Sequence, residues 1–558
     1  MVKINYDNNS NLINIITSFS EKERCMAIPG GRWVPSIRAW QYLLTPSTAS
    51  SICQSFGSLL SAEDREKLSG IVNRLNRAQA IKAETADLNL PVSNISAWKH
   101  QLVSYNMAKT LLSPDNGSSF GAGAMLALDM GCGKSKVAID LITNHPEQIQ
   151  KVLIVCPASV IDVWSGNEDM AGEFEKHATS EQFQKCLIIG VKGKDLTKKT
   201  KKAEFARQAA LHQGKQFIAI INYESAWREP FASWVKEVKF NLIVLDEIHR
   251  IKSPGGKTSK FFGQIAKTAK YRLGLTGTPL PHSPLDIYGQ YRFLDPGIFG
   301  TSFTKFRSDY ALMGGFQGHQ VVGYRNHEQL HNKMFLIAHR VMSKDVFDLP
   351  EFQPTVRTCE LSPKEMVIYD QMDKTFCAEV KSGMVTAANA LVKLLRLQEI
   401  TSGFLDGQQI GDSKKKLLAD VLEDFEINEP IVICARFTND LRMIKEVVLE
   451  AGRTYGELSG RQNDLSQWQT GNCDILGVQI KSGREGVDLT RARYTIMYSL
   501  GFSYGDYEQF IKRFNRPGQK RAGMYIHLLA QNTVDFKVMK ALEKRQEVIV
   551  SVLQQYTQ

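Results

Sequence analysis

The chain has 558 residues, and at roughly 150 residues per domain this length predicts three or four compact units. Hydrophobic residues make up 43% and charged residues 23% of the sequence, a globular composition that excludes a fibre or a disordered tail. Lys and Arg (69) exceed Asp and Glu (58) by 11, which favours a polyanionic partner.

The cysteines and the apolar runs define the expected compartment. The nine cysteines contain no Cys-x-x-Cys pair, so we expect neither a disulfide framework nor a structural zinc. No apolar run reaches the roughly 18 residues of a membrane span, and the first residues do not resemble a secretory signal. We therefore expect a cytosolic protein that does not enter a membrane.

The predicted elements begin with a separate N-terminal part. Residues 1–60 have a β-like start and the turn Pro29-Gly30-Gly31, and a charged helical stretch follows at 61–88. This predicts a small α+β accessory domain at 1–60 and a helical linker at 61–96. A first lobe is expected at 97–345 and a second at 346–558.

Both lobes show short β-branched runs that alternate with longer amphipathic stretches, the pattern of parallel sheets covered by helices. Strands of the first lobe are predicted at 125–128, 152–156, 186–191, 217–221, 242–245 and 273–275. Strands of the second lobe are predicted at 431–434, 475–478, 494–498 and 524–529. The stretches 287–342 and 362–400 show helical periodicity and few strand signals, so we expect helical insertions there. The predicted fold class is α/β with two parallel-sheet lobes.

A glycine-rich turn follows the predicted strand 125–128. It reads Asp129-Met130-Gly131-Cys132-Gly133-Lys134-Ser135. Glycines let backbone N–H groups approach phosphates, a Lys reaches the β- and γ-phosphates, and a Ser hydroxyl binds Mg²⁺. The strict pattern requires Gly where Leu128 stands, so an ordinary glycine-rich helix start is the alternative for this motif alone.

An acidic pair follows the predicted strand 242–245, in the sequence Asp246-Glu247-Ile248-His249. Ligands bind at the carboxyl ends of parallel strands, where Asp246 is expected to hold Mg²⁺ through water and Glu247 to orient and deprotonate the attacking water. The alternative is an acidic cap of the next helix. Because the two motifs occur in this order within one α/β unit, they favour hydrolysis of a nucleoside triphosphate.

With these motifs, the chain resembles the Swi/Snf-like branch of the superfamily 2 helicase-type ATPases from about residue 97 to about residue 542. Leu275-Thr276-Gly277-Thr278-Pro279 matches a further motif of the superfamily. Two later stretches are typical of this branch: Phe293-Leu294-Asp295-Pro296 and Arg340-Val341-Met342-Ser343-Lys344-Asp345-Val346. The resemblance implies two RecA-like lobes that close on ATP and Mg²⁺, and an ATP-dependent translocase on duplex or branched DNA. It also implies contacts with the DNA backbone and little sequence preference.

The resemblance also implies roles for individual residues. Catalytic roles are implied for Lys134, Asp246, Glu247, Arg513 and Arg516. Mg²⁺ binding is implied for Ser135 and Asp246. Nucleotide binding is implied for Gln101, Gly131, Gly133, Lys134, Ser135, Gly486, Asp488 and Gln509. DNA contacts are implied for Pro157, Ser159, Tyr223, Thr276, Thr278, Arg436, Phe437, Ser482 and Gly483. Arg513 and Arg516 are expected three residues apart on one helix face as arginine fingers; the alternative is a solvated helix face.

The N-terminal part resembles the HARP module of annealing helicases. The similar residues are Ile28-Pro29-Gly30-Gly31-Arg32-Trp33, Pro35, Arg38 and Trp40. The resemblance implies that basic and aromatic residues help the motor on branched DNA by gripping phosphates and stacking on unpaired bases. The alternative is that Trp33 and Trp40 fill the core of a small domain.

Several positions depart from the family pattern: Leu128, Asp129, Gly483-Arg484-Glu485, Asn515 and Pro517. Despite these departures we still expect ATP hydrolysis, but the residues that contact DNA are less well defined. Whether strands are unwound, annealed or only tracked stays open, and a strand-separating DExH helicase is the alternative function. The compact length favours a bacterial or phage enzyme of the cytoplasm, and a eukaryotic one would be nuclear.

Two further signals compete with this interpretation. His327, Glu328 and His331 form a literal His-Glu-x-x-His, which makes a zinc metalloprotease a distant alternative. A lysine-rich run offers either phosphate contacts or a solvated, mobile loop. It comprises Lys192, Lys194, Lys198, Lys199, Lys201 and Lys202.

Overall fold

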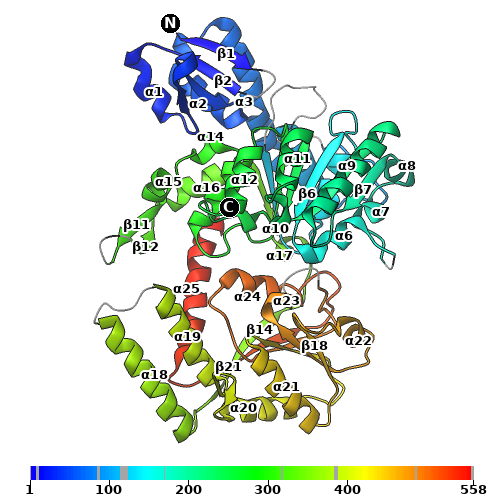
Figure 1. Ribbon diagram of the computed structural model, residues 1–558, viewed down its shortest axis with the longest axis vertical. Helices are drawn as coiled ribbons and strands as arrows, with labels where there is room; N and C mark the ends of the chain where they lie inside the picture. The colour runs from blue at the N-terminus through cyan, green and yellow to red at the C-terminus, as the bar shows by residue number, and fades with distance from the viewer. Residues whose placement is uncertain are drawn as a thin grey trace. The chain divides into compact units, whose positions relative to one another are not determined.

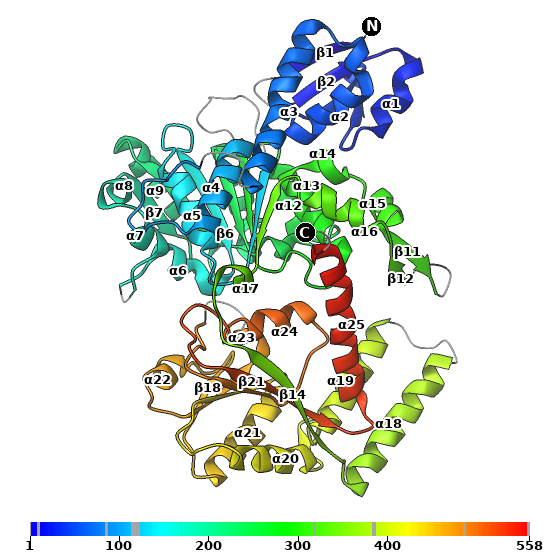
Figure 2. The same cartoon turned by 180° about the vertical axis from the view of Figure 1, so that it is seen from behind.

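The computed structural model describes residues 2–7, 12–83, 88–112, 123–168, 170–315, 318, 320–381, 387–483 and 487–554. The chain divides into two compact units, Met1–Val346 with Ile549–Gln558, and Phe347–Val548 (Figure 1). Each unit has its own parallel sheet with helices packed on it, as the reverse view shows (Figure 2). Among the described residues, no helix has both the length and the apolar character that a membrane span requires.

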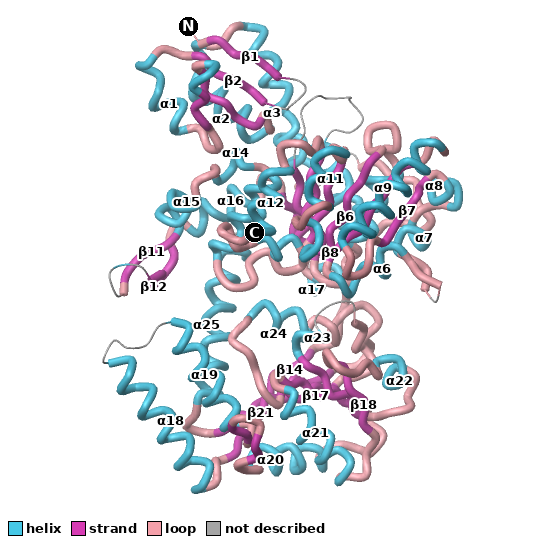
Figure 3. The backbone as a smooth tube through the Cα atoms, viewed as in Figure 1, coloured by secondary structure: helices cyan, strands magenta, loops and turns pink. Residues whose placement is uncertain are grey.

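The N-terminal module of the first unit is a four-stranded antiparallel sheet covered by helices (Figure 3). Its strands, in the order β1-β2-β4-β3, are β1 Lys3–Asp7, β2 Leu12–Ile16, β4 Ala39–Leu43 and β3 Arg32–Val34. Its helices are α1 Lys22–Ala27, α2 Pro46–Phe56 and α3 Ala62–Lys82. Alternate residues of β2 are buried, and Leu68 and Ile71 of α3 lie in the same core, so α3 completes this module.

The main sheet of the first unit has seven parallel strands in the order β13-β5-β10-β9-β6-β8-β7. They are β13 Ala338–Val341, β5 Gly123–Leu128, β10 Tyr271–Leu275, β9 Leu242–Asp246, β6 Lys151–Cys156, β8 Gln216–Asn222 and β7 Cys186–Gly190. The central strands are buried almost throughout, as expected for apolar runs covered by helices on both faces.

Helices connect these strands and cover the sheet. They include α4 Lys99–Leu112, α5 Lys134–Thr143, α6 Ile161–Ser165, α9 Leu196–His212, α10 Tyr223–Ala226, α11 Phe231–Val238 and α12 Lys257–Ile265. The stretch expected as a helical insertion holds α13 Ile287–Leu294, α14 Pro296–Phe299, α15 Phe303–Tyr310 and α16 His327–Met334.

That expectation is wrong for part of the stretch. A hairpin of β11 Ala311–Gly314 and β12 Gln320–Tyr324 interrupts the helices, and β13 joins the main sheet beside β5. β13 has four residues, too few for a period of two to be distinguished from a helical pattern.

The second unit has six parallel strands in the order β14-β21-β20-β17-β19-β18. They are β14 Phe352–Cys359, β21 Gly523–Ala530, β20 Tyr494–Met497, β17 Ile431–Ala435, β19 Ile475–Gln479 and β18 Tyr455–Leu458. The long helices are α18 Pro363–Lys381, α19 Ala387–Thr401, α20 Ser413–Glu423, α21 Thr438–Glu450 and α25 Val534–Gln554, with the shorter α24 at Tyr504–Ile511. The sequence predicts neither β14 nor β18.

Buried polar contacts attach the N-terminal module to the first unit. Thr45, the residue before α2, donates its hydroxyl to the Asp295 carboxylate at 2.8 Å. Gln79 of α3 donates to the carbonyl of Leu336, just before β13, at 3.0 Å. Arg272, near the start of β10, donates to the carbonyl next to Asp295 at 2.9 Å. The module therefore sits at the amino ends of the strands, whereas the glycine-rich turn follows the carboxyl end of β5.

Candidate active site

The glycine-rich turn follows β5 and leads into α5, which begins at Lys134. Gly131 and Gly133 both have a φ of 82°, in the left-handed region that favours glycine. A Cβ atom on Gly133 would lie 2.2 Å from the side-chain nitrogen of Gln101. The Lys134 ammonium donates to the carbonyl of Leu128 at 3.1 Å. The turn thus brings a helix N-terminus and an ammonium group to the carboxyl edge of the sheet.

Gln101 supports this turn from α4. The side chain is 3% exposed, its nitrogen donates to the Cys132 carbonyl at 3.2 Å, and its oxygen accepts from the Trp98 N–H at 3.1 Å. A ring nitrogen of His100 lies 3.1 Å from the same carbonyl. Adenine recognition by Gln101 stays a prediction, and the geometry adds a second role in holding the turn.

Asp129, one of the departures from the family pattern, fastens the turn to β13. Its N–H donates to the Val341 carbonyl at 2.9 Å, and its carboxylate accepts from the Ser343 N–H at 3.2 Å. The Ser343 hydroxyl donates to the Met130 carbonyl at 3.3 Å. No sequence motif indicated this contact, because it joins positions more than two hundred residues apart.

Asp246 lies at the end of β9 and is held from two sides. The Trp164 indole N–H donates to its carboxylate at 3.0 Å, and the Tyr223 hydroxyl donates to its backbone carbonyl at 2.8 Å. Burial and the neighbouring Glu247 raise the pKa of the Asp246 carboxyl, against the opposing effects of the Trp164 hydrogen bond and the Lys134 charge. Lys134 follows the carboxyl end of β5 and Asp246 ends β9 in the same parallel sheet, so the two sequence motifs lie at one edge of the sheet.

The site suits a divalent cation. Burial and the neighbouring Glu247 carboxylate disfavour the charged form of Asp246. A nearby positive charge stabilises that form. Ser135, in the first turn of α5, adds a hydroxyl oxygen on the same edge of the sheet. Oxygen donors of this kind are the ligands that Mg²⁺ prefers.

Glu247 has a strained backbone and a fixed side chain. Its φ of 53° and ψ of 53° lie in the left-handed region, which non-glycine residues rarely adopt. Its carboxylate is 3.3 Å from a ring nitrogen of His249, and that nitrogen is 3.0 Å from the Thr276 hydroxyl. The Thr276 hydroxyl also accepts from the Thr278 N–H at 3.0 Å. Thr276, at the end of β10, thus helps to position the acidic pair.

The last motif of the second unit differs from its expected form. α24 ends at Ile511, so Arg513 and Arg516 lie in the turn that follows it and not on one helix face. Pro517 disfavours helical backbone at Arg516, the residue before it. Arg516 is 3.8 Å from the Asp488 carboxylate. Gln509 is buried within α24, and Gly486 lies outside the described residues.

Comparison with known families decides which class of ATPase carries these motifs. The model of the SNF2-related domain matches residues 48–403, more than half of the chain, and that of the helicase conserved C-terminal domain matches residues 413–518. The chain belongs to the SNF2-related family. This confirms the expected family, its α/β fold and a helicase-type, DNA-dependent ATPase.

The SNF2-related chain is similar to proteins from phages, bacteria and archaea. It is 25% identical to "Putative protein p41" of Acyrthosiphon pisum secondary endosymbiont phage 1, over 62% of this chain and 78% of that protein. It is 23% identical to an "Uncharacterized ATP-dependent helicase" of Mycoplasma pneumoniae, over 77% of this chain but only 40% of the longer relative. A solved Sulfolobus solfataricus SWI2/SNF2 ATPase core in complex with dsDNA has 21% identity and a TM-score of 0.38, over 84% of this chain and 95% of that one.

The expected DNA contacts of the first SNF2 unit fall into exposed and buried residues. Ser159 is exposed on a short 3-10 helix, Ala158–Val160, while Pro157 is buried. Tyr223, Thr276 and Thr278 are 2%, 0% and 4% exposed. The Tyr223 hydroxyl donates to the Asp246 carbonyl, and the Thr276 hydroxyl lies 3.0 Å from a ring nitrogen of His249, so these two side chains face the acidic pair. Contact with DNA stays a prediction for all three residues.

The second SNF2 unit presents Arg436 and Phe437 after β17, both half-buried. The guanidinium of Arg436 donates to the Gln398 side chain at 2.7 Å and lies 5.5 Å from the Phe437 ring. Ser482 is half-buried, whereas Gly483 is buried, and a Cβ there would lie 2.5 Å from Val478. Gly483 therefore permits close packing and offers only its backbone to a ligand.

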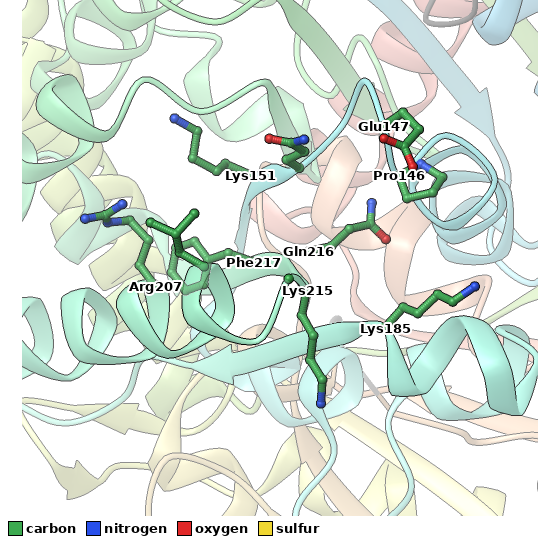
Figure 4. Close-up of a pocket in the computed structure, with 11 residues that line it drawn as sticks. Pro146, Glu147, Lys151, Lys185, Arg207, Lys215, Gln216 and Phe217 are labelled. Carbon is green, nitrogen blue, oxygen red and sulfur yellow. The ribbon is translucent and has the colours of Figure 1, made fainter.

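A cavity of about 620 Å³ lies elsewhere in the first unit (Figure 4). It is lined by Pro146, Glu147, Gln150, Lys151, Lys185, Arg207, Leu211, Gly214, Lys215, Gln216 and Phe217. Lys151 and Gln216 begin β6 and β8, so the cavity opens at the amino ends of the strands. The predicted nucleotide site, after β5 and β9, is at the opposite edge.

The zinc-protease alternative finds no support. His327 and His331 lie on α16, where the His331 ring packs 4.5 Å from Phe335. Among the described residues, no group of three or more His, Cys, Asp or Glu side chains is placed to hold a metal ion. Membership of the SNF2-related family accounts for the surrounding segment without a protease.

Proposed function

We propose that this chain hydrolyses ATP to move along double-stranded or branched DNA. The acidic pair Asp246 and Glu247, held by Trp164, His249 and Thr276, is the observation that carries this proposal. The family supports an ATPase of the helicase type. The dsDNA in the complex of the Sulfolobus solfataricus protein suggests the substrate to test.

In the proposed reaction, the ammonium of Lys134 exchanges its carbonyl partners for phosphate oxygens, and the N–H groups of the glycine turn bind beside it. Ser135 and Asp246 would hold Mg²⁺, which supplies positive charge to offset the phosphates when it is bound. Glu247 orients a water molecule and takes its proton on a carboxylate oxygen.

Arg513 and Arg516 of the second unit are proposed to offset the charge that develops on the γ-phosphate. Arginines in this role contribute about 10³ to 10⁵ in rate in related motors. Asp488, near Arg516, is suited to hold the guanidinium in place between turnovers. The distance of 3.8 Å is long for a strong ion pair, so the arginine can leave it at small cost.

Polar residues are proposed to grip the DNA backbone, led by the exposed Ser159 in the first unit and the half-buried Arg436 in the second. Phosphate contacts carry little sequence information, so the proposed motor moves on any sequence and binds more weakly at high salt.

The N-terminal module is proposed to assist on branched DNA. Trp33 is 46% exposed and lies 5.8 Å from Trp40, which is half-buried against the core of the module. The two tryptophans therefore have different proposed roles: Trp40 contributes to packing, whereas the Trp33 ring stacks on an unpaired base. A Trp33→Ser substitution tests this better than deletion of the module, because deletion would uncover the buried Asp295.

The proposal is tested by steady-state ATPase measurements with blunt duplex, forked and single-stranded DNA of equal nucleotide content. Duplex is expected to stimulate most. Glu247→Gln should still bind ATP and DNA but hydrolyse at least a hundredfold more slowly. Glu328→Gln, an exposed carboxylate on α16, is the matched control and should turn over normally.

Two outcomes would change the conclusion. If no DNA stimulates hydrolysis, the translocase proposal is wrong. If single-stranded DNA activates best and a partial duplex is unwound, a strand-separating helicase is the better conclusion; displacement of a triplex-forming strand without unwinding supports translocation on duplex.

A further inference from the structure

One face of α9 carries three lysines and a phenylalanine without any role in the fold. Lys198, Lys201, Lys202 and Phe205, here called the α9 stripe, are exposed, and Phe205 is 77% exposed. Spacings of three and four residues place them on the same side of the helix. The alternative of a mobile loop is wrong for this part of the lysine-rich run, because Asp195 caps a helix there by accepting from the Thr197 N–H at 2.9 Å.

The opposite face of α9 anchors the helix. Lys199 is buried and donates to the Ser225 hydroxyl at 2.9 Å, and Ala203, Ala206 and Ala210 are buried as well. Glu204 accepts from the Trp234 indole at 2.8 Å. Thus one lysine of the run serves packing. In the described part of the chain, the lysines of the stripe have no acidic partner within ion-pair distance, so packing does not explain them.

The stripe starts close to the expected DNA contact of the first unit. Lys192, which precedes α9, forms an ion pair with Asp162 of α6. α6 follows directly on the short helix that exposes Ser159. α9 packs on β7 and β8 and follows the carboxyl end of β7, at the same edge of the sheet where Ser159 follows the carboxyl end of β6. A DNA strand bound at Ser159 can therefore continue past Lys192 onto the α9 stripe.

We propose that the α9 stripe binds an unpaired DNA strand next to the duplex on which the motor moves. The three ammonium groups neutralise phosphates along the strand, and the Phe205 ring stacks on one base. Stacking requires an unpaired base, so the stripe distinguishes a duplex with a single-stranded tail from a blunt duplex. The inference rests on the proposed DNA-dependent function and adds a preference for partly single-stranded substrates.

The test compares the affinity of the full chain for a blunt duplex and for the same duplex with a single-stranded tail, by fluorescence anisotropy over a series of salt concentrations. Replacing Lys198, Lys201 and Lys202 with Ser should lower the slope of log affinity against log salt for the tailed DNA by about 2, at roughly 0.7 per phosphate contact of a single strand. Phe205→Ser should weaken tailed DNA about tenfold. Blunt duplex should bind and stimulate ATP hydrolysis as with the wild type.

A matched triple variant controls for net charge. It replaces Lys260, Lys267 and Lys305, which are exposed on the same unit away from α9. An equal loss in this control, or an equal loss on blunt duplex, would overturn the inference. So would unchanged binding of tailed DNA by the stripe variants while duplex still stimulates the wild type. If no DNA stimulates the wild type, the proposed function itself fails, which is a different result.

Discussion

A Thr276→Val substitution would show whether this residue serves hydrolysis or DNA binding. The Thr276 hydroxyl is completely buried, accepts from the Thr278 N–H at 3.0 Å, and lies 3.0 Å from His249. Val keeps the branched shape but leaves the N–H without an acceptor, at a cost of about 1–3 kcal/mol in stability. Glu247 also loses part of its support, and a positioned general base contributes about 10²- to 10⁴-fold. We expect kcat to fall about tenfold or more while DNA affinity is unchanged.

The measurements are kcat with saturating duplex DNA and DNA affinity by anisotropy. Thr276→Ser retains the hydroxyl and should restore most of the activity. Thr143→Val is the matched control: its buried hydroxyl donates to the Ile139 carbonyl at 2.9 Å, on α5 away from Glu247, so only stability should fall. A Thr276→Val protein with normal kcat and weakened DNA affinity would refute the reasoning and favour the DNA contact that the family resemblance implies.

Three further predictions address other contacts. Trp164→Phe removes the donor to Asp246, so turnover should fall more at acidic than at alkaline pH; a pH-rate profile of unchanged shape would contradict this. Burial lowers the pKa of His339 to about 3 from 6.5, so stability should decline as pH falls from 6.5 towards 3, and His339→Gln should flatten this decline in thermal unfolding. Thr45→Val removes the cap of α2 and the donor to Asp295, and urea unfolding should show a loss of about 1–2 kcal/mol.

The sheets show how far strands can be predicted from this sequence. Strands inside a sheet, such as β9 and β17, read as apolar runs because helices bury both faces. The strands of the two parallel sheets that the sequence missed, β13, β14 and β18, all lie at sheet edges. An edge strand has one neighbour and retains exposed positions: five of the eight residues of β14 are exposed. Its composition therefore resembles that of a loop or a short helix.

Some residues of the candidate active site could be predicted from the sequence and others could not. Lys134 and Asp246 could be predicted because each follows a recognisable strand, and parallel strands bring their carboxyl ends to one edge. The roles of Trp164 and Thr276 could not, because both depend on which neighbouring strand packs beside β9. The motif pattern gives the order of such residues along the chain but not whether a side chain points outward to DNA or inward to a carboxylate.

The position of β13 has a consequence for how the N-terminal module relates to ATP hydrolysis. The module and the phosphate turn lie at opposite edges of the sheet, so the module does not touch the nucleotide site directly. At one end of β13, Lys82 of α3 donates to the Ala338 carbonyl at 3.3 Å; at the other end, the Val341 carbonyl accepts from Asp129. The strand is about 13 Å long at roughly 3.3 Å per residue. Because an edge strand is held by one neighbour only, β13 can shift at less cost than the inner strands, and it connects the module to the phosphate turn.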